Sequence, residues 1–256
     1  KDVSIEIEEI NDKSILSILT NYNPVISTIE ISGASPLNQE MAFKILAPLI
    51  EKPFSPRKTL AAALDVIRKF KSYGYSLARI EKVSFDENTH VLLLKLSEGL
   101  ISKIIVAGNT KTKEKIITRE FPFTAGDYFK YDLAEKGLTN LRSTNLFDQI
   151  DLIIVPVGDE NEIKIKVVEK ISSVIRFGMR IDNEYQTQLS LDVRDENFNG
   201  TGTEIGATIS GGIRNRIYSL EQKANRVFDS YLTYKVRAFH EFNDISVYTD
   251  DQLTDD

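Results

Sequence analysis

Residues that commonly carry out enzymatic or metal chemistry are scarce in this sequence. Its two histidines, His90 and His240, lie in or beside strand patterns, and there is no cysteine. A catalytic or metal-binding histidine needs partners that orient it, so we interpret both as surface or sheet residues. Without cysteine, disulfides, thiolate nucleophiles and thiolate metal sites are excluded.

One acidic group, Asp192 with Asp195 and Glu196, has some likeness to a calcium loop. The turn glycine and the ligand spacing of such a loop are missing, so the polar end of a strand explains these residues. We also find no phosphate-binding glycine loop and no G-x-S-x-G nucleophile elbow. We therefore expect no catalytic residue, no metal and no cofactor in this chain.

The composition is that of a folded protein without a nucleic-acid surface. Of 256 residues, 41% are hydrophobic and 27% are charged, and the formal net charge is −6. Recognition of nucleic acid needs basic residues gathered on one face, and we see no such concentration in the sequence. No run approaches the roughly 20 apolar residues of a membrane-spanning helix. Any membrane role therefore has to come through strands or a partner.

An internal repeat organises the first two thirds of the chain. A short strand-like run ends at Gly33 and another at Gly108, and each is followed by two helical patterns and two strand patterns. In the first copy, helices are predicted to begin at Ser35-Pro36 and Ser55-Pro56, with Met41, Ile45 and Leu49 along the first and Leu60, Leu64 and Ile67 on the core face of the second. The order predicted twice is β-α-α-β-β.

Beyond about Ser172 the helical periodicity disappears, and polar and apolar residues alternate in four segments, residues 175–181, 188–194, 205–209 and 232–238. Two interpretations compete: an antiparallel sheet on a soluble core, in a periplasmic scaffold, or strands of a membrane barrel. The length of the runs and the arginines on one face favour the barrel. We expect Ile175, Phe177, Met179 and Ile181 to face lipid, and Arg176 and Arg180 to face the lumen. Only four or five strands fit before Asp256, so the barrel is incomplete and we expect the fragment to self-associate through its open edges.

The repeats and the start of the alternating region resemble a known family. The repeat with its glycine-terminated first strand (Ile31-Ser32-Gly33, Val106-Ala107-Gly108-Asn109) and the helix exits Tyr73-Gly74-Tyr75 and Asn145-Leu146-Phe147 resemble the polypeptide-transport-associated, or POTRA, domain. The run Asp195-Glu196-Asn197-Phe198-Asn199-Gly200-Thr201-Gly202 looks like the second strand and turn of bacterial surface-antigen barrels, the superfamily of the outer-membrane insertases. The likeness covers roughly residues 25–242. The first copy departs from the pattern, with Ala34 in place of the usual asparagine.

The resemblance implies an α+β chain with four parts. Residues 1–24 are an upstream linker or the remnant of a preceding domain, residues 25–99 and 100–170 are two POTRA-like domains, and residues 171–256 are the first strands of an outer-membrane β-barrel. It places the repeats in the periplasm and the barrel in the bacterial outer membrane, in contact with lipid. It also implies that the protein takes part in assembly or translocation of proteins there.

The same resemblance implies that clients bind by strand addition to the second strand of each repeat. The candidate residues are Ile80, Val83 and Phe85 in the first domain and Phe147, Ile150, Leu152 and Ile154 in the second. An equally weighted alternative is that a neighbouring domain caps these edges, or that charges such as Glu81 and Asp148 blunt them. A second functional alternative is an anchor for a patatin-like phospholipase whose catalytic domain lies upstream.

Overall fold

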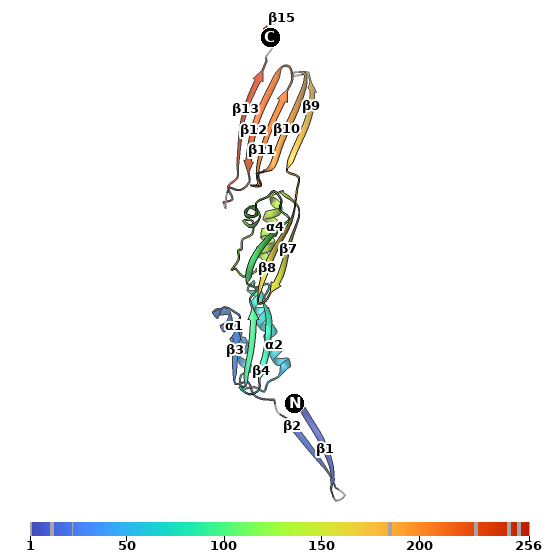
Figure 1. Cartoon of the computed structure of the whole chain (residues 1–256), viewed down its shortest axis with the longest axis vertical. Coiled ribbons are helices and arrows are strands. Elements are labelled where there is room, and N and C mark those ends of the chain that lie inside the picture. Colours follow the sequence, from blue (N-terminus) through green and yellow to red (C-terminus); the bar gives the residue numbers. More distant parts are fainter. Residues whose placement is uncertain are drawn as a thin grey trace. The chain divides into compact units, whose positions relative to one another are not determined.

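The computed structural model describes most of the chain (Figure 1). It divides into two compact units: Lys1–Lys103 with Thr124–Tyr131 and Val155–Glu162, and the remainder, Ile104–Phe123, Asp132–Ile154 and Ile163–Asp256. Each unit is described by itself below. The residues described are 2–10, 13–21, 23–183, 186–227, 230–244, 247–249 and 252–255.

The chain begins with a hairpin where the sequence suggests a linker or a domain remnant. Strands β1 (Asp2–Ile10) and β2 (Lys13–Asn21) pair antiparallel in register from Asp2↔Asn21 to Ile10↔Lys13. They form a two-stranded sheet of their own. Such a hairpin has little stability alone, so its own strands do not provide a sufficient core.

The first repeat follows in the predicted order. Its elements are β3 (Thr28–Ser32), α1 (Pro36–Leu46), a short 3-10 helix (Ala47–Leu49), α2 (Pro56–Ser72), β4 (Arg79–Asp86) and β5 (Val91–Ser97). Proline stands in the first turn of both α-helices, where a missing N–H costs nothing. The sheet order is β3-β5-β4, with β3 parallel and β4 antiparallel to the central β5.

The helices cover one face of this sheet, but the face that α2 buries differs from the predicted one. Thr59, Ala63, Val66 and Phe70 are buried against the strands, whereas Leu60 and Leu64 are 54% and 43% exposed. The prediction that Leu60 and Leu64 face the core is wrong. Apolar residues cover a broad arc of α2. The part of the arc that contains the small Ala63 packs on the sheet, and the part that contains Leu60 and Leu64 does not.

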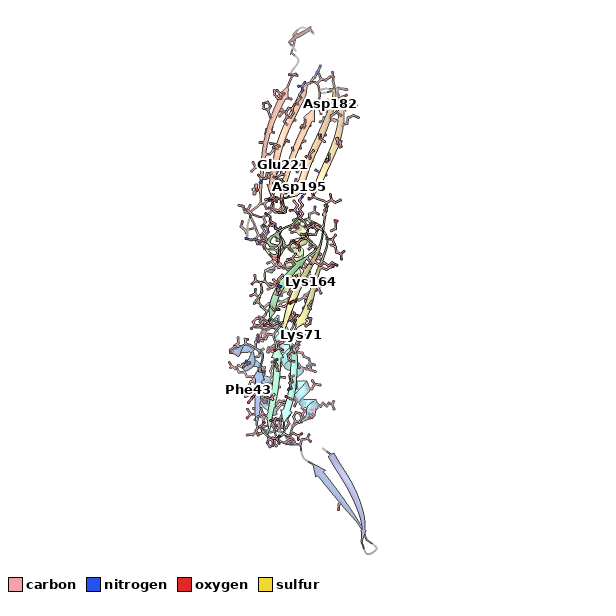
Figure 2. All side chains as sticks on the ribbon, viewed as in Figure 1. Phe43, Lys71, Lys164, Asp182, Asp195 and Glu221 are labelled. Carbon is pink, nitrogen blue, oxygen red and sulfur yellow. The ribbon has the colours of Figure 1, made fainter. Side chains whose placement is uncertain are left out.

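The second repeat has the same order, confirming the α+β class. It consists of β6 (Ile101–Ala107), α3 (Glu114–Thr118), α4 (Tyr131–Ser143), β7 (Phe147–Val157) and β8 (Glu160–Glu169), and its sheet order is β6-β8-β7. Along β8, Ile163, Ile165 and Val167 are buried while Lys164 and Lys166 are exposed, as the alternation predicts. Lys164 is labelled in Figure 2. One face of the sheet is therefore wet.

The two repeats agree in backbone detail as well as in order. The N–H of Ile26 donates to the carbonyl of Lys52 at 3.0 Å, and the N–H of Ile101 donates to that of Asp127 at 2.9 Å. Gly33 and Gly108 both have positive φ, and a Cβ added to either would lie 2.0 or 2.1 Å from a carbonyl oxygen of the central strand. No side chain fits there, so each repeat needs glycine at this position.

The alternating region forms one antiparallel meander. Its strands are β9 (Ser173–Asp182), β10 (Gln186–Phe198), β11 (Thr203–Gly211), β12 (Asn215–Ala224) and β13 (Tyr234–Asn243), in the spatial order β13-β12-β11-β10-β9. The four predicted segments omit β12, where Ile217 stands on the polar face and interrupts the alternation. A further hairpin, β14 (Val247–Thr249) with β15 (Gln252–Asp255), follows.

In the described ranges, no helix is both long and apolar enough to cross a membrane.

Candidate functional site

Strands β4 and β7 lie at the outer edge of their three-stranded sheets, opposite β3 and β6. An edge strand presents unpaired N–H and C=O groups that an extended peptide can bind. β4 belongs to the first unit, and β7 belongs to the second as far as Ile154. The candidate residues therefore form two separate edges rather than one site.

On β4, the three candidate side chains point into the core of the first repeat. Ile80, Val83 and Phe85 pack against the buried cluster, and the ring of Phe85 stacks on Phe54 with centroids 4.4 Å apart. What this edge offers a peptide is therefore its backbone. A register irregularity between Ile80 and Lys82 interrupts the pairing with β5 near one end.

On β7, the candidates Phe147, Ile150, Leu152 and Ile154 are half-buried. The alternate positions Ile153, Val155 and Val157 are exposed apolar residues that sequence reasoning did not single out. The strand is also longer than β4, 11 residues against 8. Asp148, which is exposed near its start, is the kind of charge that blunts an edge.

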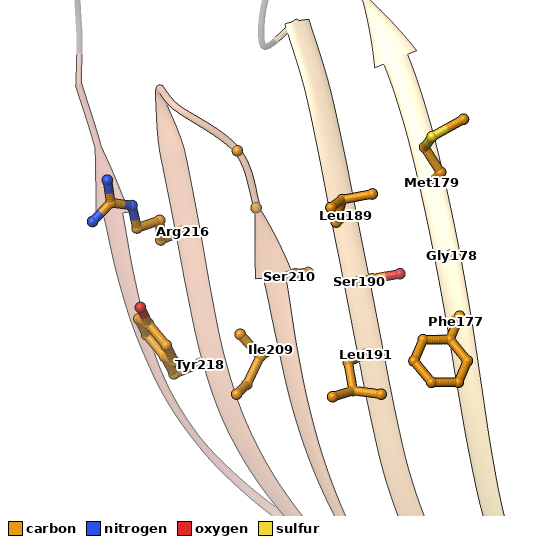
Figure 3. A pocket seen from close by; sticks show the side chains of 12 residues that line it. Phe177, Gly178, Met179, Leu189, Ser190, Leu191, Ile209, Ser210, Arg216 and Tyr218 are labelled. Carbon is orange, nitrogen blue, oxygen red and sulfur yellow. The ribbon is translucent and has the colours of Figure 1, made fainter.

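The five-stranded sheet of the second unit is amphipathic, and its apolar face is open. Ile175, Phe177, Met179 and Ile181 are between 62% and 82% exposed. Across the strands, Phe177 pairs with Leu191, and Leu191 pairs in turn with Ile209. Residues directly opposite in a pair share a face, so the apolar surface is continuous over these strands. An open depression of about 660 Å³ lies on this surface. Figure 3 shows the side chains that line it.

The opposite face carries a row of ion pairs, which we call the charge belt. Arg176 pairs with Asp192 at 2.9 Å, and Lys235 pairs with Glu221 at 3.0 Å. Arg194 lies between them, contacting Glu221 at 3.2 Å, Asp192 at 3.4 Å and Glu204. The belt thus joins all five strands through six residues, Arg176, Asp192, Arg194, Glu204, Glu221 and Lys235.

A glycine makes room for the centre of the belt. Gly206 lies directly opposite Arg194 in the pairing of β10 with β11. A Cβ added there would lie 3.1 Å from the guanidinium carbon, so Arg194 packs flat across the glycine. The second arginine named from sequence, Arg180, pairs with Asp182 at 3.0 Å and is largely exposed.

The turn between β10 and β11 is fixed to the second repeat by buried polar contacts. Asn197 donates to Thr112 Oγ1 at 2.9 Å, and the two residues are only 4% and 2% exposed. The N–H of Lys113 donates to the carbonyl of Gly200 at 2.9 Å. The Nζ of Lys111 lies 2.8 Å from the carboxylate of Asp195, which explains this aspartate as an ion-pair partner. Asp195 is labelled in Figure 2.

A second junction lies between the repeat and the segment after β12. Arg226 contacts Glu120 at 2.8 Å, and Arg119 contacts the same carboxylate at 3.2 Å. All three side chains are nearly buried. The sequence provides no local signal for this cluster, because Glu120 and Arg226 are 106 positions apart. Among the residues described, no group of His, Cys, Asp or Glu suits a metal ion.

Glu169, at the end of β8, organises the loop of residues 110–112, which contacts the turn between β10 and β11. It accepts a 2.6 Å hydrogen bond from the N–H of Thr112, a 2.9 Å bond from that of Lys111 and a 2.5 Å bond from the Thr110 hydroxyl. Burial opposes ionisation, but the hydrogen bonds to the carboxylate outweigh it and lower the pKa of Glu169 to about 2.

Acid is therefore expected to loosen this loop. Because the folded pKa is depressed, the stabilisation is present above the unfolded pKa of about 4.5 and is lost as the pH falls toward about 2. Hydrogen exchange of residues 109–113, followed between pH 5 and 2.5, should rise in the native chain relative to β8. Glu169→Gln should show fast exchange of this loop already at pH 5, and an unchanged loop would contradict the assignment.

Comparison with known proteins supports the interpretation of the repeats. Residues 100–170 match the model of the family described as POTRA, surface antigen variable number repeat. The outer membrane protein assembly factor BamA of Nitratidesulfovibrio vulgaris is 28% identical over 156 residues, covering 55% of this chain and 20% of that protein. The protein of the same name from Buchnera aphidicola is 27% identical over 166 residues, covering 61% of this chain and 27% of its own length. The chain thus spans about a quarter or less of these relatives.

Solved structures show the same fold. The N-terminal domain of Omp85 from Thermosynechococcus elongatus superposes with a TM-score of 0.57 at 18% identity, covering 66% of this chain and 76% of that one. BamA from Haemophilus ducreyi lacking POTRA domains 1–3 gives a TM-score of 0.53 at 17% identity, covering 86% of this chain and 43% of that one. The second match extends beyond the length of the two repeats, so it includes part of the alternating region.

Proposed function

Since this chain carries POTRA-type repeats of the surface-antigen superfamily, we propose that it is the polypeptide-binding region, and the start of the barrel, of a protein that assembles or translocates other proteins at the bacterial outer membrane. The observation that carries the proposal is the match of residues 100–170 to the POTRA family directly before an amphipathic sheet. The relatives named as outer membrane assembly factors support the same role.

The proposed location follows from the chemistry of the two parts. The repeats, with wet sheet faces, belong in the periplasm. The five-stranded sheet belongs in the outer membrane, with Ile175, Phe177, Met179 and Ile181 against lipid and Arg176 and Arg180 toward water. The exposure of its apolar face supports this arrangement, because a surface of this extent on a soluble protein normally meets a partner. After carbonate extraction, we expect the full protein to remain in the membrane fraction.

For the binding step, we propose strand addition at the edges of β4 and β7. The bound peptide would pair with the backbone of the edge strand, and alternate side chains would meet the neighbouring surface. At β7 that surface includes the exposed Ile153. Backbone pairing suits a protein that handles many clients, because it depends little on their sequence.

A cross-linking experiment tests the edge of β7. The chain has no cysteine, so Asp148→Cys on the edge and Lys136→Cys on the exposed side of α4 can each carry a benzophenone label. A twelve-residue peptide of alternating valine and threonine should cross-link severalfold more at position 148. The same peptide with proline at alternate positions lacks the N–H groups for pairing and should lose that excess. Equal yields at the two positions, or from the two peptides, would contradict strand addition.

We also propose that the isolated chain self-associates. Strands β9 and β13 end the five-stranded sheet within the described residues, and an open edge with an apolar face pairs readily with another copy. Light scattering of the purified chain should show dimers or larger species whose population grows with concentration. A monodisperse monomer at high concentration would contradict this.

For residues 1–24, we propose the remnant of a preceding repeat rather than a linker. Shifted by 75 positions, β1 and β2 would occupy residues 77–85 and 88–96, close to β4 (Arg79–Asp86) and β5 (Val91–Ser97). The β1–β2 hairpin therefore precedes β3 in the chain much as the β4–β5 hairpin of the first repeat precedes β6. The phospholipase-anchor alternative has no observation in its favour.

A further inference from the structure

One end of the apolar face of the five-stranded sheet carries an arginine, Arg216. It is the second residue of β12 and lies next to the turn between β11 and β12, among the residues that line the depression of about 660 Å³. In the antiparallel meander, this turn lies at the end of the sheet opposite to the β10–β11 turn, which contacts the second repeat. Neither strand addition at β4 and β7 nor the charge belt involves Arg216.

Arg216 interrupts an otherwise uncharged part of this face. Tyr218 pairs with Ile209 of the apolar face, and Arg216 stands two positions before Tyr218, so it lies on the same face. In the strands β9 to β13, all of which the structure describes, the other Asp, Glu, Lys or Arg on this face is Asp195. That aspartate lies at the opposite end of the sheet and is paired with Lys111. The charged lining of the depression is therefore Arg216 alone, and its charge is positive.

The neighbours of Arg216 across the strands leave its guanidinium uncovered. Gly211 stands opposite it on β11, and Phe242 stands opposite it on β13. Neither can neutralise the charge, whereas a directly opposed carboxylate would stabilise a solvated sheet. In the part of the chain that the structure describes, the guanidinium has no ion pair and no side-chain hydrogen bond. Its N–H donors are therefore available to an external anion.

Donors and apolar surface lie on different sides of the depression. Tyr218, the next residue on this face after Arg216, is 43% exposed and adds a hydroxyl donor. Figure 3 shows Arg216 and Tyr218 on one side, and Phe177 and Met179, both largely exposed, on the other. The depression thus suits a molecule with one anionic group and an apolar body.

The position of Arg216 in the strand decides what the arginine can bind. On a lipid-facing strand, an arginine is costly at the middle of the bilayer and tolerated near its headgroups. Arg216 stands next to the end residue of β12, which puts it at headgroup level when the sheet spans the membrane as proposed. A guanidinium binds phosphate through two parallel N–H donors, and tyrosine is common at the same level of a membrane.

We propose that Arg216 and Tyr218 bind the phosphate of an anionic membrane lipid, whose acyl chains lie along the apolar residues of the depression. This inference rests on the proposed membrane location of the sheet. An acidic peptide fits the site less well, because its further carboxylates and its backbone groups would meet an apolar face without another cation. With the repeats in the periplasm, the bound lipid belongs to the outer leaflet.

The composition of the chain provides a direct readout. It contains no tryptophan, so Phe177→Trp places a single emitting residue in the depression. The full chain with this change is titrated in zwitterionic detergent with phosphatidylglycerol that carries brominated acyl chains, and separately with phosphatidylcholine that carries the same chains. Bromine quenches tryptophan emission on contact. We expect half-maximal quenching at about fivefold less phosphatidylglycerol than phosphatidylcholine, which is the effect of one arginine on an anionic lipid.

Variants locate the preference. Added to Phe177→Trp, Arg216→Gln should abolish the difference between the two lipids, while quenching by phosphatidylcholine persists. Arg180→Gln is the matched control, since Arg180 lies near the same end of the sheet on the opposite face, and this variant should keep the difference.

The outcomes that overturn the site differ from those that overturn the membrane location. Equal quenching by both lipids, or equal loss of the preference in Arg216→Gln and Arg180→Gln, would remove the headgroup site and leave the membrane location intact. Quenching by neither lipid would contradict both. Shielding of the tryptophan that grows with protein concentration would assign the face to a second copy of the chain. Displacement of phosphatidylglycerol by a peptide of alternating leucine and aspartate would assign it to an acidic polypeptide.

Discussion

Replacing Arg194 by leucine is expected to destabilise the five-stranded sheet by about 3 kcal/mol, because one guanidinium serves three carboxylates. Asp192, Glu204 and Glu221 are each between 16% and 22% exposed, and Arg194 itself is 16% exposed. Without the arginine, Asp192 keeps its ion pair with Arg176 and Glu221 keeps its ion pair with Lys235. The mutual repulsion of the three carboxylates is then no longer compensated by the guanidinium. The expected cost therefore exceeds that of an ordinary surface pair.

Arg180→Leu is the matched control for this variant. Arg180 stands on the same face, but it is 72% exposed, and among the residues that the structure describes it forms an ion pair with Asp182 alone. Its loss should cost under about 1 kcal/mol. Hydrogen exchange of β10 to β12 in detergent measures both variants, and Arg194→Leu should raise exchange across these three strands. Adding Glu204→Gln to Arg194→Leu should recover part of the loss. If the two arginine variants behave alike, the charge belt does not stabilise the sheet.

The alternation of residue types predicted the two faces of this sheet, but it did not predict the charge belt. A side-chain period of two places Arg176 and Asp192 on the polar face from the sequence alone. Which charges then meet depends on the register of neighbouring strands, and that register is set by turns whose geometry the pattern does not contain. Arg194 and Glu221, for example, are 27 positions apart and come from strands that are not adjacent.

The helices show the same limit. The starts of α1 and α2 were predictable, since proline follows serine at both. The buried face of α2 was not, because its apolar arc is wider than the strip that contacts the sheet. Leu60 and Leu64 lie on the part left outside, and only packing against β4 and β5 decides between the two parts. On α1, Met41 and Ile45 pack at the margin of the core, whereas Leu37 remains exposed.

The glycine-rich turn after β10 was visible in the sequence, but its partner was not. Asn197, Gly200 and Gly202 lie within a run that resembles a barrel turn, and the structure shows what the run contacts. The loop at Lys111 and Thr112 approaches the backbone of Gly200 from the second repeat. Two segments that are 85 positions apart thus meet through a buried amide and a buried hydroxyl.

Replacing Gly200 by alanine is expected to separate this turn from the second repeat, at a cost above about 3 kcal/mol. An added Cβ would lie 1.9 Å from the carbonyl oxygen of Lys111, a distance that only a backbone movement relieves. The positive φ of +67° adds about 1 kcal/mol or more of strain for any L-residue. Movement of the turn would also weaken the hydrogen bond between Asn197 and Thr112, whose buried groups then lack partners.

Gly158→Ala separates the two contributions. Gly158 has a similar φ of +59°, but no atom lies within 4 Å of the added Cβ, so this control carries the backbone strain without the clash. Thermal unfolding should show a small loss for Gly158→Ala and a much larger one for Gly200→Ala, with faster hydrogen exchange at residues 109–113 in the latter only. Asn197→Ala should add little to Gly200→Ala, because both act through the same contact. Full additivity of the two would mean that Asn197 and Gly200 act through independent contacts, and it would contradict the assignment of a single junction between the turn and the loop.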